Sequence, residues 1–269
     1  MKYQVHQASS LVATEFIVLS SGLGGHANFW NSQIDTLKKY FHVLTYDQEG
    51  CTSDTKLLKN DYSLTDMAQQ VLDILNQEQI EQCHFLGHAL GGHIGAELAV
   101  LMEQENRRGV GHKKLLSLTS LNAWDELDPH TEKCFTARIA LLKCAGVRAY
   151  VEAQALFLYP PKWISQNIEI IKNAEEAQLK HFPPVENIFS RLGALQKFKI
   201  NEQHIEALKN TKIHLIANQD DFLVPYHKSF DLKLKLGHGT CSVFAHGAHA
   251  SSITEAEIIN KSIVDFLMN

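Results

Sequence analysis

Residues 85–92 read Phe-Leu-Gly-His-Ala-Leu-Gly-Gly, and this stretch fits a sharp strand-to-helix turn with alanine at its centre. In the pattern Gly-x-Ser-x-Gly, such a turn exposes a serine oxygen at the top of a parallel sheet, where it acts as a nucleophile. Gly87 and Gly91 suit the turn, because a Cβ two residues to either side of its centre would crowd it. Ala89 has only a methyl group at the nucleophile position. The stretch therefore predicts the turn without its nucleophile.

Short apolar runs, rich in β-branched and aromatic residues, recur on both sides of this turn. Continuous apolarity is what strands buried on both faces of a parallel sheet require. Helical patterns lie between the runs: residues 64–75 follow a plausible N-cap, Ser63, with Asp66 in the first turn, and residues 89–101 follow the turn itself. This alternation predicts an α/β fold with a mostly parallel, doubly wound sheet. The expected strands are residues 16–19, 41–46, 83–86, 115–121, 213–217 and 242–245.

The alternation stops after Trp124, and residues 125–200 have helical patterns throughout, broken at Tyr-Pro-Pro and Phe-Pro-Pro. We therefore expect a core formed by residues 1–124 and 201–269, with a helical cap inserted at 125–200 over the carboxyl edge of the sheet. Residues 103–114 are charged and contain glycine, and are expected to form an exposed loop. Four apolar residues of the cap suit core packing best, with a pocket lining or a homodimer interface as alternatives: Phe157, Leu158, Tyr159 and Trp163.

Composition restricts the class of protein. The chain has 269 residues, a net charge of -5 and a pI near 6.3, so we expect neither nucleic acid nor an acidic membrane surface as a partner. Residues 1–10 contain no apolar signal region, and no apolar run is long enough to span a bilayer. We expect no metal and no cofactor, because the 15 histidines are spread without metal-ligand spacing. Five cysteines without a Cys-x-x-Cys pair suit a reducing cytoplasm: Cys51, Cys83, Cys134, Cys144 and Cys241.

A glycine-rich segment, Ser-Ser-Gly-Leu-Gly-Gly at residues 20–25, follows the first expected buried strand. Such a turn can direct the backbone N–H of Leu23 into a site at the sheet edge, and the N–H of Leu90 would supply a second donor for an oxyanion hole. A phosphate-binding loop or a plain turn are the alternatives. Residues 46–50, Tyr-Asp-Gln-Glu-Gly, are expected to be a structural turn. The residues expected to contact substrate are Gly22, Gly24, His26 and His246, although His26 fits an ordinary loop histidine equally well.

An acid and a histidine follow the last two expected strands. Asp221 lies four residues before Pro225, where this architecture positions the carboxylate that orients a histidine, and Asp220 is a solvated alternative. His249 lies in a loop of small residues and is the expected base, whereas His246 lies closer to the strand. The order of turn, acid and histidine along the chain favours this assignment. His88 is expected to point away from the catalytic face and to pack or form hydrogen bonds.

Together these segments resemble the α/β-hydrolase superfamily over the whole chain and, within it, the RutD family. The narrower resemblance rests on Gly-His-Ala-Leu-Gly, Ser-Gly-Leu-Gly-Gly, the Tyr-Asp-Gln turn and residues 150–163. It implies the α/β-hydrolase fold and a hydrolase of pyrimidine (uracil) catabolism and nitrogen utilisation, acting on aminoacrylate or carbamate. Members of this family also have alanine at the turn. Two features depart from the family: Glu49 replaces the usual arginine, and the 103–114 segment is longer.

Alanine at the nucleophile position excludes an acyl-enzyme at Ala89. His249, held by Asp221, can instead act as general base toward a water near Ala89, and such assistance accelerates reactions by about 10²–10⁴-fold. This modest acceleration suits a substrate that is already labile.

Two further hypotheses remain open. The chain could be a catalytically inactive ligand-binding protein with this fold, or an ordinary serine esterase whose nucleophile has been replaced. A side nucleophile such as Ser21 or Cys51 has no base at recognisable spacing.

Overall fold

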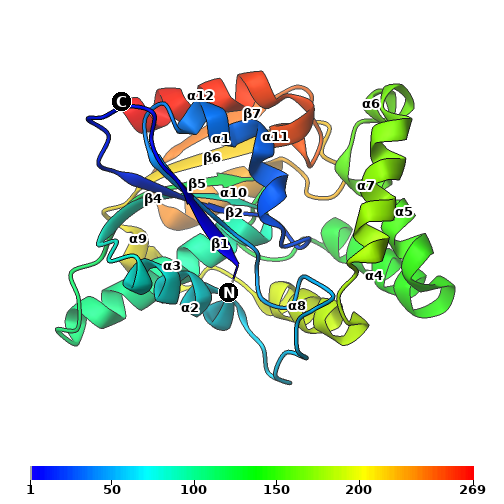
Figure 1. Ribbon diagram of the computed structural model, residues 1–269, viewed down its shortest axis with the longest axis horizontal. Coiled ribbons are helices and arrows are strands. Elements are labelled where there is room, and N and C mark those ends of the chain that lie inside the picture. The colour runs from blue at the N-terminus through cyan, green and yellow to red at the C-terminus, as the bar shows by residue number, and fades with distance from the viewer. Residues whose placement is uncertain (1) are drawn as a thin grey trace.

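The computed structural model describes residues 2–269, with a seven-stranded sheet at the centre (Figure 1). The strand order is β1-β3-β2-β4-β5-β6-β7, and every neighbouring pair is parallel except β1 and β3. All six strands expected from the sequence are present. The strands are β1 (Tyr3–His6), β2 (Phe16–Ser20), β3 (His42–Tyr46), β4 (Gln82–His88), β5 (Lys114–Leu121), β6 (Lys212–Asn218) and β7 (Thr240–Phe244).

The antiparallel edge strand β1 was not predicted from the sequence. Its four residues, Tyr-Gln-Val-His, alternate in polarity and lack the continuous apolar run of the buried strands. Pairing with β3 places Val5 opposite Leu44, and Tyr3 and Val5 pack against the core. A four-residue strand of this kind is determined by its partner strand more than by its own sequence.

Helices cover both faces of the sheet, which explains why the strands are apolar on both sides. Ile17 and Leu19 of β2 pack in a cluster with Ile259 and Ile263, whereas Val18 belongs to the larger cluster on the opposite face. Figure 1 shows α1 (Asn31–Leu37) and α12 (Ala256–Met268) on one face of the sheet. The other face carries α2 (Leu64–Gln77), α3 (Leu90–Arg107) and α9 (Glu202–Leu208). Helix α10 (His227–Leu236) packs on this second face as well.

The first turn of α2 confirms the expected cap. Ser63 Oγ accepts a hydrogen bond from the N–H of Asp66 at 3.3 Å, and Asp66 Oδ2 accepts one from the N–H of Ser63 at 2.9 Å. This reciprocal capping box satisfies two N–H groups that the helix leaves without partners.

Helix α3 is longer than expected, and the prediction of a loop over residues 103–114 was wrong in its first part. Residues 103–107 continue the helix, where Glu103 and Arg107 form an ion pair at 2.6 Å with the i,i+4 spacing of helical neighbours. Charged residues suit a solvent-facing helical surface as well as a loop, so composition alone did not separate the two. The loop is limited to residues 108–113.

A run of helices separates β5 from β6 and lies to one side of the sheet in Figure 1. The N–H of Ile200 donates to the carbonyl of Asp125 at 2.8 Å, so the two ends of the run meet. The N–H of Ala250, after β7, donates to the carbonyl of Leu158 at 2.9 Å and ties the run to the sheet. Its helices are α4 (Pro129–Ala140), the π-helical turn η2 (Leu141–Ala145), α5 (Gly146–Leu158), α6 (Pro161–Gln166), α7 (Ile168–Lys180) and α8 (Val185–Lys197), followed by α9.

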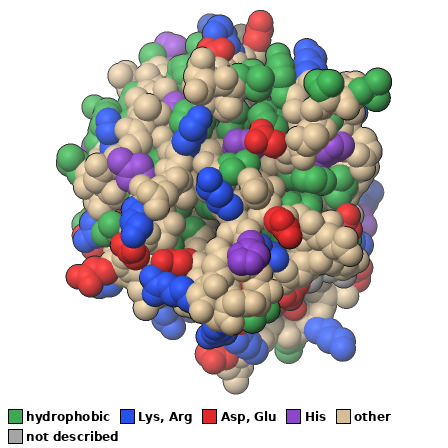
Figure 2. All heavy atoms as spheres, turned by 90° about the vertical axis from the view of Figure 1, so that its left-hand side faces the viewer, with side chains coloured by type: hydrophobic (Ala, Val, Ile, Leu, Met, Phe, Trp, Pro, Cys, Tyr) green, Lys and Arg blue, Asp and Glu red, His purple; other side chains and the backbone are tan. Residues whose placement is uncertain are grey.

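The surface opposite these helices has both signs of charge interspersed among polar and apolar side chains (Figure 2). No helix within residues 2–269 combines the length and apolarity that crossing a membrane would require.

Candidate active site

Ala89 occupies a strained backbone conformation at the junction of β4 and α3. Its φ of 46° and ψ of -108° lie in a region that residues other than glycine rarely adopt, at a strain of about 1–3 kcal/mol. Its N–H donates to the carbonyl of Leu121 at 2.7 Å, and its carbonyl accepts from the N–H of Gly92 at 2.9 Å. A Cβ on Gly91 would collide with the carbonyl of Ser20. The strand-to-helix turn at residues 87–91 thus has the geometry called a nucleophile elbow, and Ala89 at its tip has only a methyl group.

Asp221 and His249 come together at the carboxyl ends of β6 and β7. Nδ1 of His249 donates to Oδ2 of Asp221 at 2.8 Å, and both side chains are buried. Oδ1 of Asp221 accepts the N–H groups of Leu223 at 2.8 Å and Val224 at 2.9 Å. Because Nδ1 carries the hydrogen, Nε2 is left to accept a proton, and it forms no hydrogen bond within residues 2–269. The structure thus brings the predicted acid and base together.

Asp220 holds the histidine loop. Its carboxylate accepts the N–H groups of Gly247 at 3.2 Å and Ala248 at 2.8 Å, so it is more than the solvated neighbour that the sequence suggested. Ala248 has a φ of 53°, a second strained position beside His249. His246 has an exposed side chain, and only its backbone carbonyl is bound, by Asn218 at 2.6 Å. These contacts bring Asp220, but not the His246 side chain, into the support of the Asp221–His249 pair.

The backbone carbonyl of His249 is held by two side chains that the sequence analysis did not assign to the site. His88 Nε2 donates to it at 2.8 Å, and Asn122 Nδ2 donates at 2.7 Å. The rings of His88 and His249 also meet edge to face, with centroids 4.6 Å apart. His88 therefore forms hydrogen bonds as expected, but it packs against the base instead of pointing away. Burial lowers the pKa of His88 to about 3, so it stays neutral and keeps this arrangement at ordinary pH.

Asn122 could have been found from its position, because it follows β5 directly, as His88 ends β4. Polar residues at the carboxyl ends of parallel strands gather at one edge of a sheet. Asn122 also has a positive φ of 51°, which asparagine tolerates better than most residues.

The two expected oxyanion donors, Leu23 and Leu90, lie in adjacent segments. The turn from Ser20 to Gly25 packs against the start of α3, since a Cβ on Gly91 would also lie 2.9 Å from the carbonyl of Ser21. Within residues 2–269, neither the N–H of Leu23 nor that of Leu90 donates to a protein acceptor. A Cβ on Gly22 would lie 2.8 Å from Nδ1 of His88, so this glycine permits the close approach, whereas Gly24 is exposed with open space around it.

His26 joins Asp47 and Cys51 in a cluster beside the glycine turn. Nδ1 of His26 lies 3.9 Å from Oδ1 of Asp47 and 3.8 Å from Sγ of Cys51, so Cys51 does have a histidine nearby, contrary to the expectation from spacing. Cys51 and Asp47, however, both face Nδ1 of His26. In a catalytic triad the histidine contacts the nucleophile through one ring nitrogen and the acid through the other. Burial also raises the pKa of Cys51 to about 11, so its thiol stays protonated.

The same three residues can direct one ligand atom each to a common point, as a metal site requires. A thiol with a pKa near 11 is a poor ligand until it loses its proton. The guanidinium of Arg191 lies against the same turn, since a Cβ on Gly25 would be 2.7 Å from Nη1. A fixed positive charge there opposes a cation, and we assign no metal to the cluster. Ser21 Oγ, the other side nucleophile considered, is buried without a hydrogen-bond partner.

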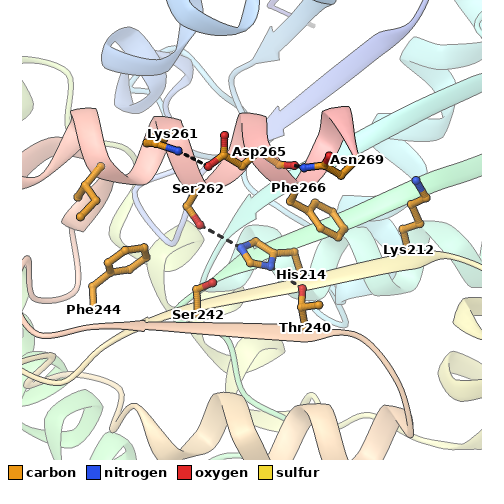
Figure 3. A pocket seen from close by; sticks show the side chains of 11 residues that line it. Lys212, His214, Thr240, Ser242, Phe244, Lys261, Ser262, Asp265, Phe266 and Asn269 are labelled. Carbon is orange, nitrogen blue, oxygen red and sulfur yellow. Dashed lines mark hydrogen bonds and ion pairs between the residues drawn. The ribbon is translucent and has the colours of Figure 1, made fainter.

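A pocket of about 670 Å³ lies away from these residues, between β6, β7 and α12 (Figure 3). His214 is at its centre, with Nδ1 2.7 Å from Thr240 Oγ1 and Nε2 3.2 Å from Ser262 Oγ. Burial lowers the pKa of His214 to about 4, so the ring is neutral and held by hydroxyls. None of the predicted site residues lines this pocket.

Comparison with known proteins identifies relatives along the whole chain. Residues 15–138 match the family model described as alpha/beta hydrolase fold. A protein of Acinetobacter baylyi named "Putative carbamate hydrolase RutD" is 48% identical over 267 residues, covering 99% of this chain and 98% of that relative. A protein of the same name from Stutzerimonas stutzeri is 39% identical, covering 99% and 96%. The enol-lactonase of Burkholderia xenovorans superimposes with a TM-score of 0.82 at 19% identity, covering 100% and 96% of the two chains.

Proposed function

Because the chain belongs to the RutD family of proteins with the α/β-hydrolase fold, we propose that it is a cytoplasmic hydrolase of pyrimidine catabolism that assists the breakdown of aminoacrylate or carbamate. The observation that supports this most strongly is the 2.8 Å bond between His249 and Asp221 in a chain whose elbow residue is Ala89. In this proposal the base acts at the position of Ala89, which has no nucleophile of its own. Water is the natural occupant of that position.

The proposed reaction uses water directly. His249 Nε2 takes a proton from a water near Ala89 as the water oxygen bonds to the amine-bearing carbon of the substrate. The π electrons of that carbon's double bond move into the carboxylate in aminoacrylate, or onto an oxygen in carbamate. The protonated His249 then gives a proton to the substrate nitrogen, the double bond re-forms as the carbon–nitrogen bond breaks, and ammonia leaves. From aminoacrylate this step leaves an enol, which tautomerises to the oxo acid. Aminoacrylate and water give an oxo acid and ammonia, and carbamate and water give bicarbonate and ammonia. No covalent bond to the protein forms, in keeping with the methyl group of Ala89.

The surrounding groups support this role without taking part in bond changes. In the proposed reaction, the N–H groups of Leu23 and Leu90 stabilise the negative charge that builds up on the substrate as water adds. Asp221 keeps the imidazole in the tautomer with Nε2 free and stabilises its protonated form. The total acceleration available from one base and two donors is modest, and this suits a substrate that also breaks down unaided.

A ligand-binding protein without catalysis is the alternative, and the burial of Asp221 argues against it. An oriented carboxylate–imidazole pair brings no advantage in binding a small acid, whereas it is what a general base requires.

Ammonia release from freshly generated carbamate and aminoacrylate tests the proposal. We expect the protein to raise the first-order rate of ammonia release above the spontaneous rate for one of the two compounds, in proportion to protein concentration. If both rates equal those without protein, the enzymatic function is wrong and the binding alternative is favoured.

A further inference from the structure

Arg191 is a wholly buried cation whose charge is not paired within the chain. It lies in α8, and its Nη2 donates to Oε1 of Gln48, a neutral group. Its Nε and Nη1 have no hydrogen-bond partner, and none of the ion pairs formed by residues 2–269 includes it. The guanidinium stays charged at any ordinary pH, so burial does not remove the charge.

No carboxylate of residues 2–269 forms an ion pair with this guanidinium. Burial raises the pKa of Tyr46 and of Tyr62 above the ordinary value for a phenol, and that of Cys51 to about 11, so all three are neutral. The hydroxyl of Tyr62 is itself buried without a partner. Asp47 accepts the N–H of Ala27 at 2.9 Å and faces His26. A buried charge without a counterion has a large desolvation cost, which an anion from outside the chain would offset.

The guanidinium lies against the turn that carries the predicted oxyanion donor. A Cβ on Gly25, whose φ is 82°, would be 2.7 Å from Nη1 and 2.8 Å from Nη2. Gln48 links the two: its Nε2 donates to the carbonyl of Ser21 at 2.7 Å, and its N–H donates to the carbonyl of Gly25 at 2.8 Å. The same turn meets the start of α3 at Gly91. The glycine turn of residues 20–25 therefore contacts Arg191 at its Gly25 end and the start of α3 at its Ser20 end.

We propose that Arg191 binds the carboxylate of the substrate, which fixes the substrate class as a small monocarboxylate. A guanidinium has five N–H groups, and Gln48 uses one of them, so one edge of the planar fork remains free for both oxygens of a carboxylate. This inference rests on the proposed function, since it places the amine-bearing carbon between Ala89 and His249 while the carboxylate lies at Arg191.

The inference also separates the two candidate substrates. In aminoacrylate the carboxylate and the amine-bearing carbon are different atoms, so one can be held while the other reacts. In carbamate the carboxylate carbon is itself the reacting carbon, and holding its two oxygens as an ion pair would stabilise the ground state against attack by water. Arg191 therefore favours aminoacrylate.

The test compares propanoate, a stable carboxylate, with its uncharged amide, propanamide, by titration followed by NMR. We expect the wild-type protein to bind propanoate and to bind propanamide at least about tenfold more weakly. The side-chain Nε–H resonance of Arg191, assigned as the one missing from Arg191→Lys, is expected to shift on adding propanoate. Arg191→Met is expected to bind propanoate at least about tenfold more weakly, whereas Arg148→Met, which removes an exposed arginine of α5, binds it as the wild type does.

The outcomes distinguish this inference from the proposed function. If the Arg191 resonance does not move at saturating propanoate, or if folded Arg191→Met binds propanoate like the wild type, Arg191 is only a tether between α8 and Gln48 and the inference is wrong. The resonance measurement uses the wild-type protein, so it decides the matter even where Arg191→Met fails to fold. Binding of propanoate through Arg191 in a protein that releases no ammonia would uphold the carboxylate site and contradict only the catalytic role.

Discussion

Nδ1 of His249 lies 2.8 Å from Oδ2 of Asp221, and the second oxygen of this carboxylate is held by two backbone N–H groups. The carboxylate is therefore fixed before it orients the imidazole. This order of support is that of the acid and the histidine in a hydrolase triad, and Ala89, at the predicted nucleophile position, has no side-chain oxygen.

Asp221→Asn is expected to lower ammonia release by about 10²–10⁴-fold, because an amide cannot stabilise the protonated imidazole and permits the wrong tautomer. The rate at saturating aminoacrylate measures the effect. Asp73→Asn, which changes an exposed carboxylate on α2, provides the matched control and is expected to leave the rate unchanged. Equal rates for Asp221→Asn and the wild type would show that the carboxylate has no catalytic role.

Ala89→Ser is expected to reduce ammonia release by at least about tenfold, because the new hydroxyl fills the space of the attacking water. The rate with aminoacrylate and the trapping of an acyl-enzyme with p-nitrophenyl acetate are the two measurements. Rapid ester turnover through a trapped acyl-enzyme would instead indicate a serine esterase that has lost its nucleophile.

Stability is expected to fall as the pH is lowered from about 6.5 toward 4. Burial lowers the pKa of His88 and His93 to about 3 and that of His214 to about 4, whereas in the unfolded chain a histidine pKa is near 6.5. The unfolded state therefore binds more protons below pH 6.5, and each histidine lowers the free energy of unfolding by at most about 1.4 kcal/mol per pH unit. Above pH 6.5 this contribution is fully present.

Urea unfolding at pH 7.5, 6 and 5 measures this dependence. His214 lines the pocket away from the site. His214→Asn is expected to reduce the slope of the free energy of unfolding against pH by up to about 1.4 kcal/mol per pH unit, the contribution of one proton. A free energy of unfolding that is as high at pH 5 as at pH 7.5 would show that these histidines do not remain neutral in the folded protein.

Gly91→Ala is expected to destabilise the protein severely, because its Cβ would collide with the carbonyl of Ser20. Gly193→Ala provides the comparison, since nothing lies within 4 Å of its Cβ, and alanine in a helix is favoured over glycine by about 1 kcal/mol. Thermal unfolding followed by circular dichroism separates the two. If the two variants unfold at similar temperatures, the close contact between α3 and the glycine turn is not required.

The sequence predicted the parts of the fold that depend on local pattern. The six parallel strands follow from continuous apolar runs, and the turn at Ala89 follows from its flanking glycines. The strand β1 could not be predicted in this way, because four alternating residues acquire their conformation by pairing with β3. Likewise, residues 103–107 form helix by continuing α3, which the charge pattern alone did not indicate.

In the candidate site, too, the sequence predicted some residues and not others. Asp221 and His249 follow strands in a recognisable order, so the sequence predicted them as a pair. Asn122 and Arg191 act through contacts between distant segments, with partners at residues 249 and 48, and no spacing in the sequence indicates such a contact.

Replacing His249 by alanine tests the account most directly. The account predicts that His249→Ala lowers the protein-dependent release of ammonia from aminoacrylate by about 10²–10⁴-fold, to near the spontaneous rate. His112→Ala, in the exposed loop after α3, is expected to match the wild type. A folded His249→Ala protein that releases ammonia at the wild-type rate would contradict the role of His249 as the base that activates water.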